Sequence, residues 1–310
     1  MKTSTDTSCR PEEPAQEQNS FLNQFFTSVA VYLPPAGVLA ALIFWWYQGI
    51  AVSYCVMAAL SFLITGFGIT GGYHRLLTHQ SFIAKPWLKV IFAIAGSMAL
   101  EGNLFDWCAR HNEHHKKSDM DGDPHSPHGL SGILRGLIHA HIGWIFKVRQ
   151  PTQAEYEEYI PHLLKDRGMV FVNKHFPWWV AIRLILPTII GMFLNDSFLV
   201  GAFLGFLWGA AIPVFFVHHV TWSINSLCHW SGKREFETAD FSTNNWLCAL
   251  LGLGEGWHNN HHMFRYSARH GLRWWQIDTT YLLIKTLERC GLVSRVLVPT
   301  PAQIEKARRK

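Results

Sequence analysis

The sequence carries little charge for its length. Asp, Glu, Lys and Arg make up only 16% of its 310 residues, whereas about 25% is usual in soluble domains. Hydrophobic residues make up 49%, and they include 14 Trp and 21 Phe. This composition argues against a wholly soluble protein and indicates that part of the surface faces lipid.

Two familiar patterns are missing as well. The six cysteines form no Cys-x-x-Cys pair, which argues against a disulfide framework and against a thiolate metal site. Residues 1–20 show no charged segment followed by an apolar run, so no cleaved signal peptide is predicted. We expect residues 1–28 to form a polar, disordered lead-in.

Four apolar stretches are long enough to cross a bilayer, which takes about 20 residues. They form two pairs, each separated by a break of three residues, and this predicts two transmembrane hairpins over residues 29–72 and 178–217. A fifth stretch, residues 88–104, is interrupted by Gly96, Glu101 and Gly102. We interpret it as an interfacial or re-entrant helix, because a span there would separate the histidines described below. The individual spans are expected at about 29–46, 50–72, 178–194 and 198–217.

The distribution of positive charge predicts the topology. Of the 27 Lys and Arg residues, all except Arg183 lie outside the two hairpins. Because positive loops stay in the cytoplasm, both termini and the regions 73–177 and 218–310 are expected there. The predicted fold is an all-α integral membrane protein with four transmembrane helices and a cytoplasmic helical cap.

The 18 histidines are the most informative feature of the sequence, because two copies of a His-x-x-His-His pattern occur among them. Histidines at positions i, i+3 and i+4 share one face of a helix, so each copy forms half of a metal site. His74 and His79 form a third cluster. Their spacing turns the side chain by about 140° on an α-helix, so they serve different metals or the helix ends between them. The two copies are His111, His114 and His115, and His258, His261 and His262.

The number of histidines bears on the metal. Imidazole suits Zn, Cu, Fe and Ni. Zinc enzymes use about three protein ligands, so eight clustered histidines indicate two metal ions. No carboxylate recurs at the Glu-x-x-His spacing of soluble di-iron bundles. Two redox-active irons would allow the reduction of O2.

In these motifs the sequence resembles the membrane fatty acid desaturase family, and within it the bacterial-type, acyl-CoA Δ9 (stearoyl-CoA desaturase-like) branch. The three family boxes, HRxxxH, HRxHH and HNxHH, occur in order between about residues 71 and 271. Asn112 departs from the pattern, because Arg is common there. Family-like elements also surround Trp107, Asp123-Pro124-His125, Trp144, Thr221-Trp222 and Gly254-Glu255-Gly256.

The resemblance implies a ninth histidine ligand, His229, in an Asn-Ser-x-x-His element. Asn225 of that element would reach one iron through a water molecule. Thr221, Trp222 and Trp144 would line the tunnel for the acyl chain, and no catalytic residue is expected beyond the metal ligands. His125 and His141 are interpreted as neighbours of the site. The implied ligands are His74, His79, His111, His114, His115, His229, His258, His261 and His262.

The implied activity is O2-dependent desaturation in fatty acid biosynthesis. A di-iron site would introduce a cis double bond, at Δ9, into a saturated chain carried by CoA or by a lipid. No His-Pro-Gly-Gly motif of a fused cytochrome b5 is present, so electrons would come from a separate cytochrome b5, ferredoxin or reductase. The site is expected on the cytoplasmic face of a bacterial inner membrane, with no nucleic acid partner.

Two other functions stay open on the sequence alone. A histidine-box hydroxylase of alkanes or lipids would use the same metals and differ only in its product. A haem-binding electron-transfer membrane protein would use pairs of the histidines. A zinc membrane protease is a weaker alternative, because the sequence has no His-Glu-x-x-His motif.

Overall fold

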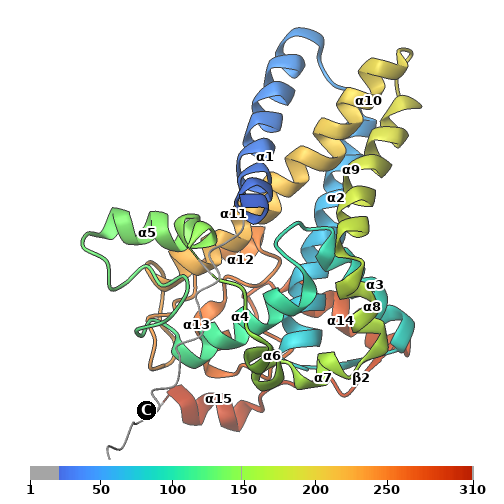
Figure 1. Cartoon of the computed structure of the whole chain (residues 1–310). Helices are drawn as coiled ribbons and strands as arrows, with labels where there is room; N and C mark the ends of the chain where they lie inside the picture. Colours follow the sequence, from blue (N-terminus) through green and yellow to red (C-terminus); the bar gives the residue numbers. More distant parts are fainter. Residues whose placement is uncertain (1–20, 148, 309–310) are drawn as a thin grey trace, which may run out of the picture.

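The computed structural model describes residues 21–147 and 149–308 and has two levels (Figure 1). Long helices rise from a base of shorter helices. The first two are α1 (Phe21–Gln48) and α2 (Val52–Phe67), and α2 continues directly into a π-helix, η1 (Gly68–Thr78). The long helix of the C-terminal half is continuous from Phe198 to His229. Its parts are α10 (Phe198–Phe206), the π-helix η3 (Leu207–Ala211), α11 (Ile212–Ser226) and the 3-10 helix η4 (Leu227–His229).

Three helices in the described residues are long and apolar enough to cross a membrane: Gln24–Gln48, Val52–Thr78 and Phe198–His229. A further pair, α8 (Arg167–Lys174) and α9 (Phe176–Met192), is bent by 61° and gives a fourth span only if the two count as one. The prediction of a helical fold is therefore confirmed, with three candidate membrane spans, while the fourth span and the cytoplasmic cap stay predictions.

α9 and α10 pack against each other through glycines. A Cβ atom on Gly191 would lie 2.3 Å from the carbonyl oxygen of Gly201, and one on Gly205 would lie 2.3 Å from that of Pro187. Small residues let two helix backbones approach closely where lipid offers no hydrophobic driving force. These three glycines therefore make the second hairpin tight.

Arg183 is the one cation inside a predicted hairpin, and it is only 2% exposed. Its guanidinium donates to the carbonyl oxygen of Gly209 in η3 and to the hydroxyl of Ser61 on α2. An intramembrane charge is costly unless polar groups surround it. These contacts explain how α9 tolerates an arginine.

The base holds shorter helices and one small sheet. β1 (Ile83–Ala84) pairs antiparallel with β2 (Val293–Ser294). α3 (Pro86–Ser97) has 12 residues, too few to span a bilayer, which agrees with the interfacial helix predicted there. The other elements are α4 (Leu104–Lys117), α5 (Ile133–His141), η2 (Gly143–Phe146), α6 (Gln153–Tyr159), α7 (Pro161–Leu164), α12 (Trp246–Leu251), α13 (His258–Met263), α14 (Thr279–Arg289) and α15 (Pro301–Arg308).

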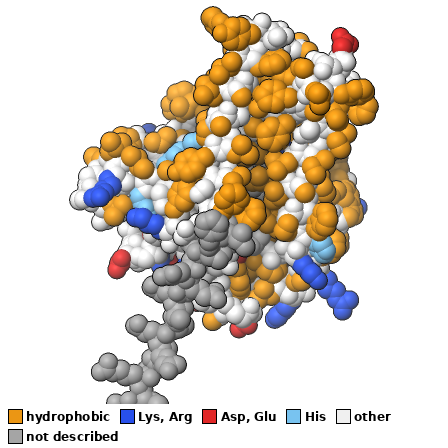
Figure 2. Space-filling model, turned by 45° about the horizontal axis from the view of Figure 1, so that its top comes forward, with side chains coloured by type: hydrophobic (Ala, Val, Ile, Leu, Met, Phe, Trp, Pro, Cys, Tyr) orange, Lys and Arg blue, Asp and Glu red, His pale blue; other side chains and the backbone are white. Residues whose placement is uncertain are grey.

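The surface agrees with this division. Hydrophobic side chains cover the long helices, and most of the Lys and Arg side chains in view lie lower on the molecule (Figure 2). Large apolar residues on the long helices, such as Trp46, Val52 and Leu199, are 76–84% exposed. Lipid would cover such a surface.

Three predicted boundaries were wrong. Residues 1–20 of the predicted lead-in lie outside the described residues, but residues 21–28 already belong to α1. The second span was expected to end at residue 72 and the fourth at 217, yet both helices continue into the histidine site, to Thr78 and His229. The helices continue through polar residues because these side chains have buried partners, as Arg75 has in Glu255 and Asp278.

Candidate metal centre

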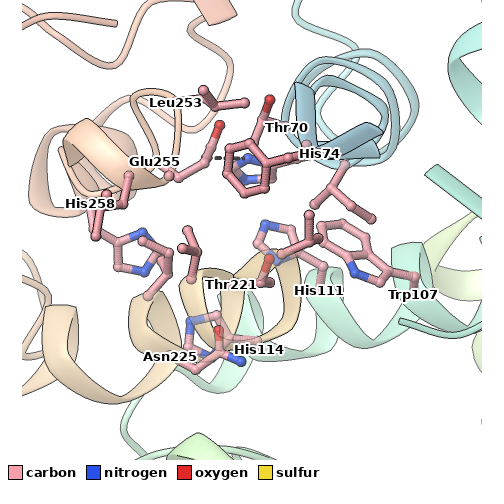
Figure 3. A pocket seen from close by; sticks show the side chains of 18 residues that line it. Thr70, His74, Trp107, His111, His114, Thr221, Asn225, Leu253, Glu255 and His258 are labelled. Atoms are coloured by element: carbon pink, nitrogen blue, oxygen red, sulfur yellow. Dashed lines mark ion pairs between the residues drawn. The ribbon is translucent and has the colours of Figure 1, made fainter. Parts of the chain in front are cut away.

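The nine predicted ligands converge in two groups at the base of the long helices. In each group the candidate ligand nitrogens lie within 4.8 Å of one another. They come from η1 and its C-terminal residue, α4, η4 and α13, and Figure 3 shows several of them around one pocket. The first group is His74, His79, His111, His115 and His261, and the second is His114, His229, His258 and His262.

The nitrogen–nitrogen distances fit metal coordination. In the first group, Nε2 of His115 lies 2.9 Å from Nε2 of His111 and 2.9 Å from Nε2 of His261. In the second group, Nε2 of His258 lies 3.0 Å from Nε2 of His229. Adjacent imidazoles at about 2.1 Å from one metal ion, at right angles, would be about 3.0 Å apart.

One ligand atom is otherwise unexplained. Nε2 of His114 is buried and has no hydrogen-bond partner among the described residues. A buried polar atom without a partner is costly, and a metal ion would satisfy it. The donor set, the spacing and this orphaned atom together show that the residues fit two metal ions.

The π-helix η1 resolves the spacing of the first box. In a π-helix the backbone bonds join residues five apart, and the amide of His79 donates to the carbonyl of His74 at 3.0 Å. Their imidazole rings therefore lie close, with centroids 4.8 Å apart. Both histidines belong to one group, so the α-helical separation of about 140° does not apply.

Carboxylates hold the outer nitrogens of four ligands. Nδ1 of His229 lies 2.7 Å from Asp119, and that of His262 lies 2.7 Å from Asp240. Such a partner fixes the imidazole tautomer and leaves Nε2 free to bind a metal. The other two pairs are His114 with Asp123 at 3.1 Å and His74 with Glu255 at 2.6 Å.

The protonation states also suit metal binding. Burial lowers the pKa of His111, His115, His258 and His261 well below the ordinary value, so these imidazoles are neutral. Burial alone would raise the pKa of Asp119, but its hydrogen bond to His229 and the charge of that ring hold the pKa at about 2. Divalent ions bind imidazole in its neutral form, so the lowered pKa values of these four rings favour metal binding.

The sequence did not assign these four carboxylates. Asp123 and Glu255 stood in family-like elements but received no role. Asp119 and Asp240 gave no signal, because they lie in irregular loops far from their partners in the chain. Nothing in the sequence indicated a role for His270, which forms a further group with His74 and Glu255.

A largely apolar pocket leads to both groups. His74, His111, His114 and His258 line its inner end, together with Asn225 and Thr221 (Figure 3). The lining also includes apolar residues such as Phe62 on α2, Val220 on α11 and Leu251 on α12. Thr221 and Asn225 therefore line this pocket, and their roles toward the substrate and the metal stay predictions.

The two tryptophans assigned to the tunnel lie beside the pocket and are not among its lining residues. Trp222 is 6% exposed and packs against His218, with ring centroids 4.9 Å apart. Trp144 faces His125 at 5.1 Å. Their role toward substrate stays a prediction. Trp107, which stacks on His111 at 5.1 Å, lines the pocket instead.

Glu101 is a half-buried residue beside this pocket. Trp107 Nε1 donates to it at 3.1 Å, and one of its oxygens has no partner among the described residues. Burial raises its pKa to about 7, although Thr221 and Trp107 act in the opposite direction. A raised pKa means that the stability it confers is complete below pH 4.5 and is lost as the pH rises through about 7.

We therefore expect Glu101→Gln to be more stable than the wild type above pH 7, by up to ~3 kcal/mol, and equal to it in acid. The apparent Tm in detergent at a series of pH values measures this. The exposed Glu237 supplies the control, since Glu237→Gln should leave the pH profile unchanged. Parallel profiles for wild type and Glu101→Gln would show that Glu101 is not desolvated.

Comparisons with known proteins agree with the site. The family description "Fatty acid desaturase" matches residues 50–289. A hex-5-enoyl-acyl-carrier-protein acetylenase of Moorena producens is 38% identical over 280 residues, which cover 88% of this chain and 86% of that protein. An acyl-CoA C20 Delta5-desaturase of Anemone leveillei is 40% identical over 250 residues, 80% and 75% of the two chains. An sn-1 stearoyl-lipid 9-desaturase of Synechocystis is 39% identical over 254 residues, 81% and 74%.

Proposed function

Because this chain belongs to the fatty acid desaturase family, we propose that it introduces a cis double bond, at Δ9, into a saturated fatty acyl chain. One observation carries the proposal. A single apolar pocket ends at both histidine groups, so a featureless methylene chain in it would lie against both.

Iron is the metal that we assign to the two groups. The two groups consist of nine imidazoles and contain no carboxylate, and such a donor set suits iron, copper or zinc. Iron is chosen among these because the family is di-iron dependent. Bound iron would supply the reduction of O2 and the oxidation of an unactivated CH2 group. The reaction balances as R–CH2–CH2–R′ + O2 + 2 e⁻ + 2 H⁺ → R–CH=CH–R′ + 2 H2O. We propose all nine histidines as ligands and Asn225 as a ligand through water.

The pocket positions the acyl chain relative to the two histidine groups. Its apolar walls exclude water, and they hold one C–C bond of the chain on the order of 3–3.5 Å from the reacting atoms. Thr221 and Trp107 line the pocket together with His111, and we propose that they fix the bend of the chain. Trp222 packs against His218 and Trp144 against His125, and we propose that they shape the tunnel from outside its lining. These residues would set the double-bond position.

The electrons come from a separate protein in this proposal, such as a cytochrome b5, ferredoxin or reductase. Its docking face is the basic base of the molecule, which carries most of the Lys and Arg residues and faces the cytoplasm of a bacterial inner membrane. A haem protein is disfavoured, because the two groups gather five and four imidazoles, whereas a haem iron takes at most two protein ligands, one on each face.

Fatty acid profiling of a bacterial host that expresses the chain tests the proposal. We expect a new cis monounsaturated acid, with its double bond at Δ9, that is absent from a host expressing a variant without one ligand histidine. Mass spectrometry of the products decides the reaction type. A product that gains one oxygen atom would replace desaturation by hydroxylation.

The carrier of the acyl chain is the remaining part of the proposal. CoA, acyl carrier protein and a membrane lipid are the three carriers that the names of the relatives contain, and all three offer the same methylene groups to the pocket. They differ in the direction from which the chain arrives. A thioester dissolves in the cytoplasm, whereas a lipid ester is confined to the bilayer.

A further inference from the structure

The mouth of the pocket lies between three helices. Among its lining residues Leu251 at the end of α12 is 50% exposed, while Phe62 on α2 and Val220 on α11 are half-buried. All three are apolar. The histidine ligands at the other end are far less accessible, with His74 4% and His258 3% exposed. The pocket therefore opens beside Leu251, between α2, α11 and α12.

The outer face of α12 is unusually apolar. Trp246, Leu247, Leu250 and Leu251 are 48–67% exposed, and residues 241–254 contain no charged side chain. A neighbouring loop adds Trp274 at 93% and Ile277 at 56% exposed. We name these six residues the α12 collar. Exposed apolar patches of this kind mark contact with membranes or partners.

The two parts of the collar are joined through the protein. The indole of Trp257, which follows α12, donates to the carbonyl of Ile277 at 2.7 Å, and its ring meets that of Trp275 at 5.5 Å. The amide of Thr280 donates to the carbonyl of Leu253 at 3.0 Å. The collar is therefore one surface held on the base.

This surface is continuous with the membrane helices. α12 lies directly below α11 at the foot of the long helices (Figure 1). The helices that flank the mouth also expose apolar side chains, namely Leu63 and Ile64 on α2 and Phe216 on α11. A bilayer that surrounds α2 and α11 would reach the collar without crossing a charged zone. Its occupant is therefore lipid rather than a soluble partner.

We infer that the acyl chain enters sideways from the bilayer, through the mouth at Leu251, while still esterified to a membrane glycerolipid. This inference rests on the proposed function and names its substrate class. A chain that takes this route exchanges lipid tails for apolar walls and crosses no water, so entry costs little free energy. The polar head stays at the interface, where the collar is seated.

Photolabelling in proteoliposomes tests the route with the iron-loaded full chain. One arm uses phosphatidylcholine vesicles in which one acyl chain carries a diazirine. The other arm adds acyl-CoA with the same diazirine chain to the aqueous phase. After irradiation, mass spectrometry maps the adducts. We expect the lipid probe to label Trp107 and Thr221 at the inner end of the pocket.

The variant Leu251→Trp fills the mouth, and we expect it to lower this labelling by roughly tenfold. Leu282→Trp is the matched control, because Leu282 is 58% exposed and lies outside the pocket and the collar. It should label like the wild type. Apparent Tm and iron content show whether a variant folds. If Leu251→Trp does not fold, Val220→Phe narrows the same mouth from α11.

Labelling by the acyl-CoA probe alone would overturn the inference, and so would labelling by the lipid probe that Leu251→Trp leaves unchanged. The readout does not need turnover. The two proposals can fail separately. If the lipid probe labels the pocket and Leu251→Trp blocks this labelling, but the host makes no new double bond, the entry route stands and the desaturase activity is rejected. If the host makes a new double bond but the lipid probe does not label the pocket, the activity stands and the entry route is rejected.

Discussion

His261→Ala is expected to abolish desaturation and to remove about one of the two iron ions from each chain. His261 is the only residue of α13 in the five-histidine group, because His258 and His262 belong to the other group. Its Nε2 atom lies 2.9 Å from that of His115 and 3.1 Å from that of His74. It therefore joins the third box to the first two.

The size of the effect follows from this position. Loss of a residue that only supports a metal ligand typically costs 10–100-fold in affinity or activity, so loss of a ligand should cost more than about 100-fold. The other four histidines of the group already point their own nitrogens at the same point, and they cannot replace the missing nitrogen without moving the helices. Iron analysis and fatty acid profiling measure the two effects.

His218→Ala is the matched control for His261→Ala. His218 is also buried, at 2% exposure, but its Nε2 atom contacts the carbonyl of Ala99 at 2.9 Å and lies outside both groups. This variant should keep two iron ions even if its stability falls. If His261→Ala retained both iron ions and the product, His261 would not be a ligand.

The sequence singled out the nine candidate ligands but not the side chains that surround them. The two His-x-x-His-His patterns predicted three imidazoles on one helix face, and the structure divides each set of three between the two groups. Of the two alternatives given for His74 and His79, the structure agrees with the second, because η1 ends at Thr78. That this helix is a π-helix was not predicted, because nothing in the local pattern distinguishes a π-helix from an α-helix. The wider helix depends on tertiary packing, such as the close contact of Gly68 with the backbone of α3.

The carboxylates that contact the ligand histidines could not be predicted from the sequence. Asp119 and His229 are 110 residues apart in the chain, and Asp119 lies in an irregular turn with a positive φ of 57°. No periodicity connects two such residues. The span boundaries failed for a related reason. Hydropathy cannot show that Arg75, 0% exposed, is paired with Glu255 and Asp278 and thus compatible with a continuing helix.

Asp119→Asn is expected to weaken the four-histidine group and leave the five-histidine group intact. Asp119 accepts hydrogen bonds from Nδ1 of His229 at 2.7 Å and from the amide of Phe241 at 2.8 Å. Asn keeps the size of the side chain and adopts positive φ readily, so the turn should persist. Only the negative charge behind His229 is lost.

Without that charge, Nε2 of His229 becomes a weaker donor to a metal ion. We expect affinity at this group to fall by about 10–100-fold. Iron measured after competition with a chelator should then show two classes, one ion lost early and one retained. Since the pKa of Asp119 is held at about 2, the wild-type charge is complete at neutral pH, and the difference should not depend on pH between about 6 and 9.

Asp121→Asn controls for the loss of one negative charge from the same turn. Asp121 is exposed and has no hydrogen bond to a ligand histidine. It should retain both iron ions like the wild type. Equal iron retention by Asp119→Asn and Asp121→Asn would mean that the carboxylate only orients His229, because the amide oxygen of Asn preserves that orientation. Asp119→Ala, which removes the acceptor as well, would then be the variant that releases the ion.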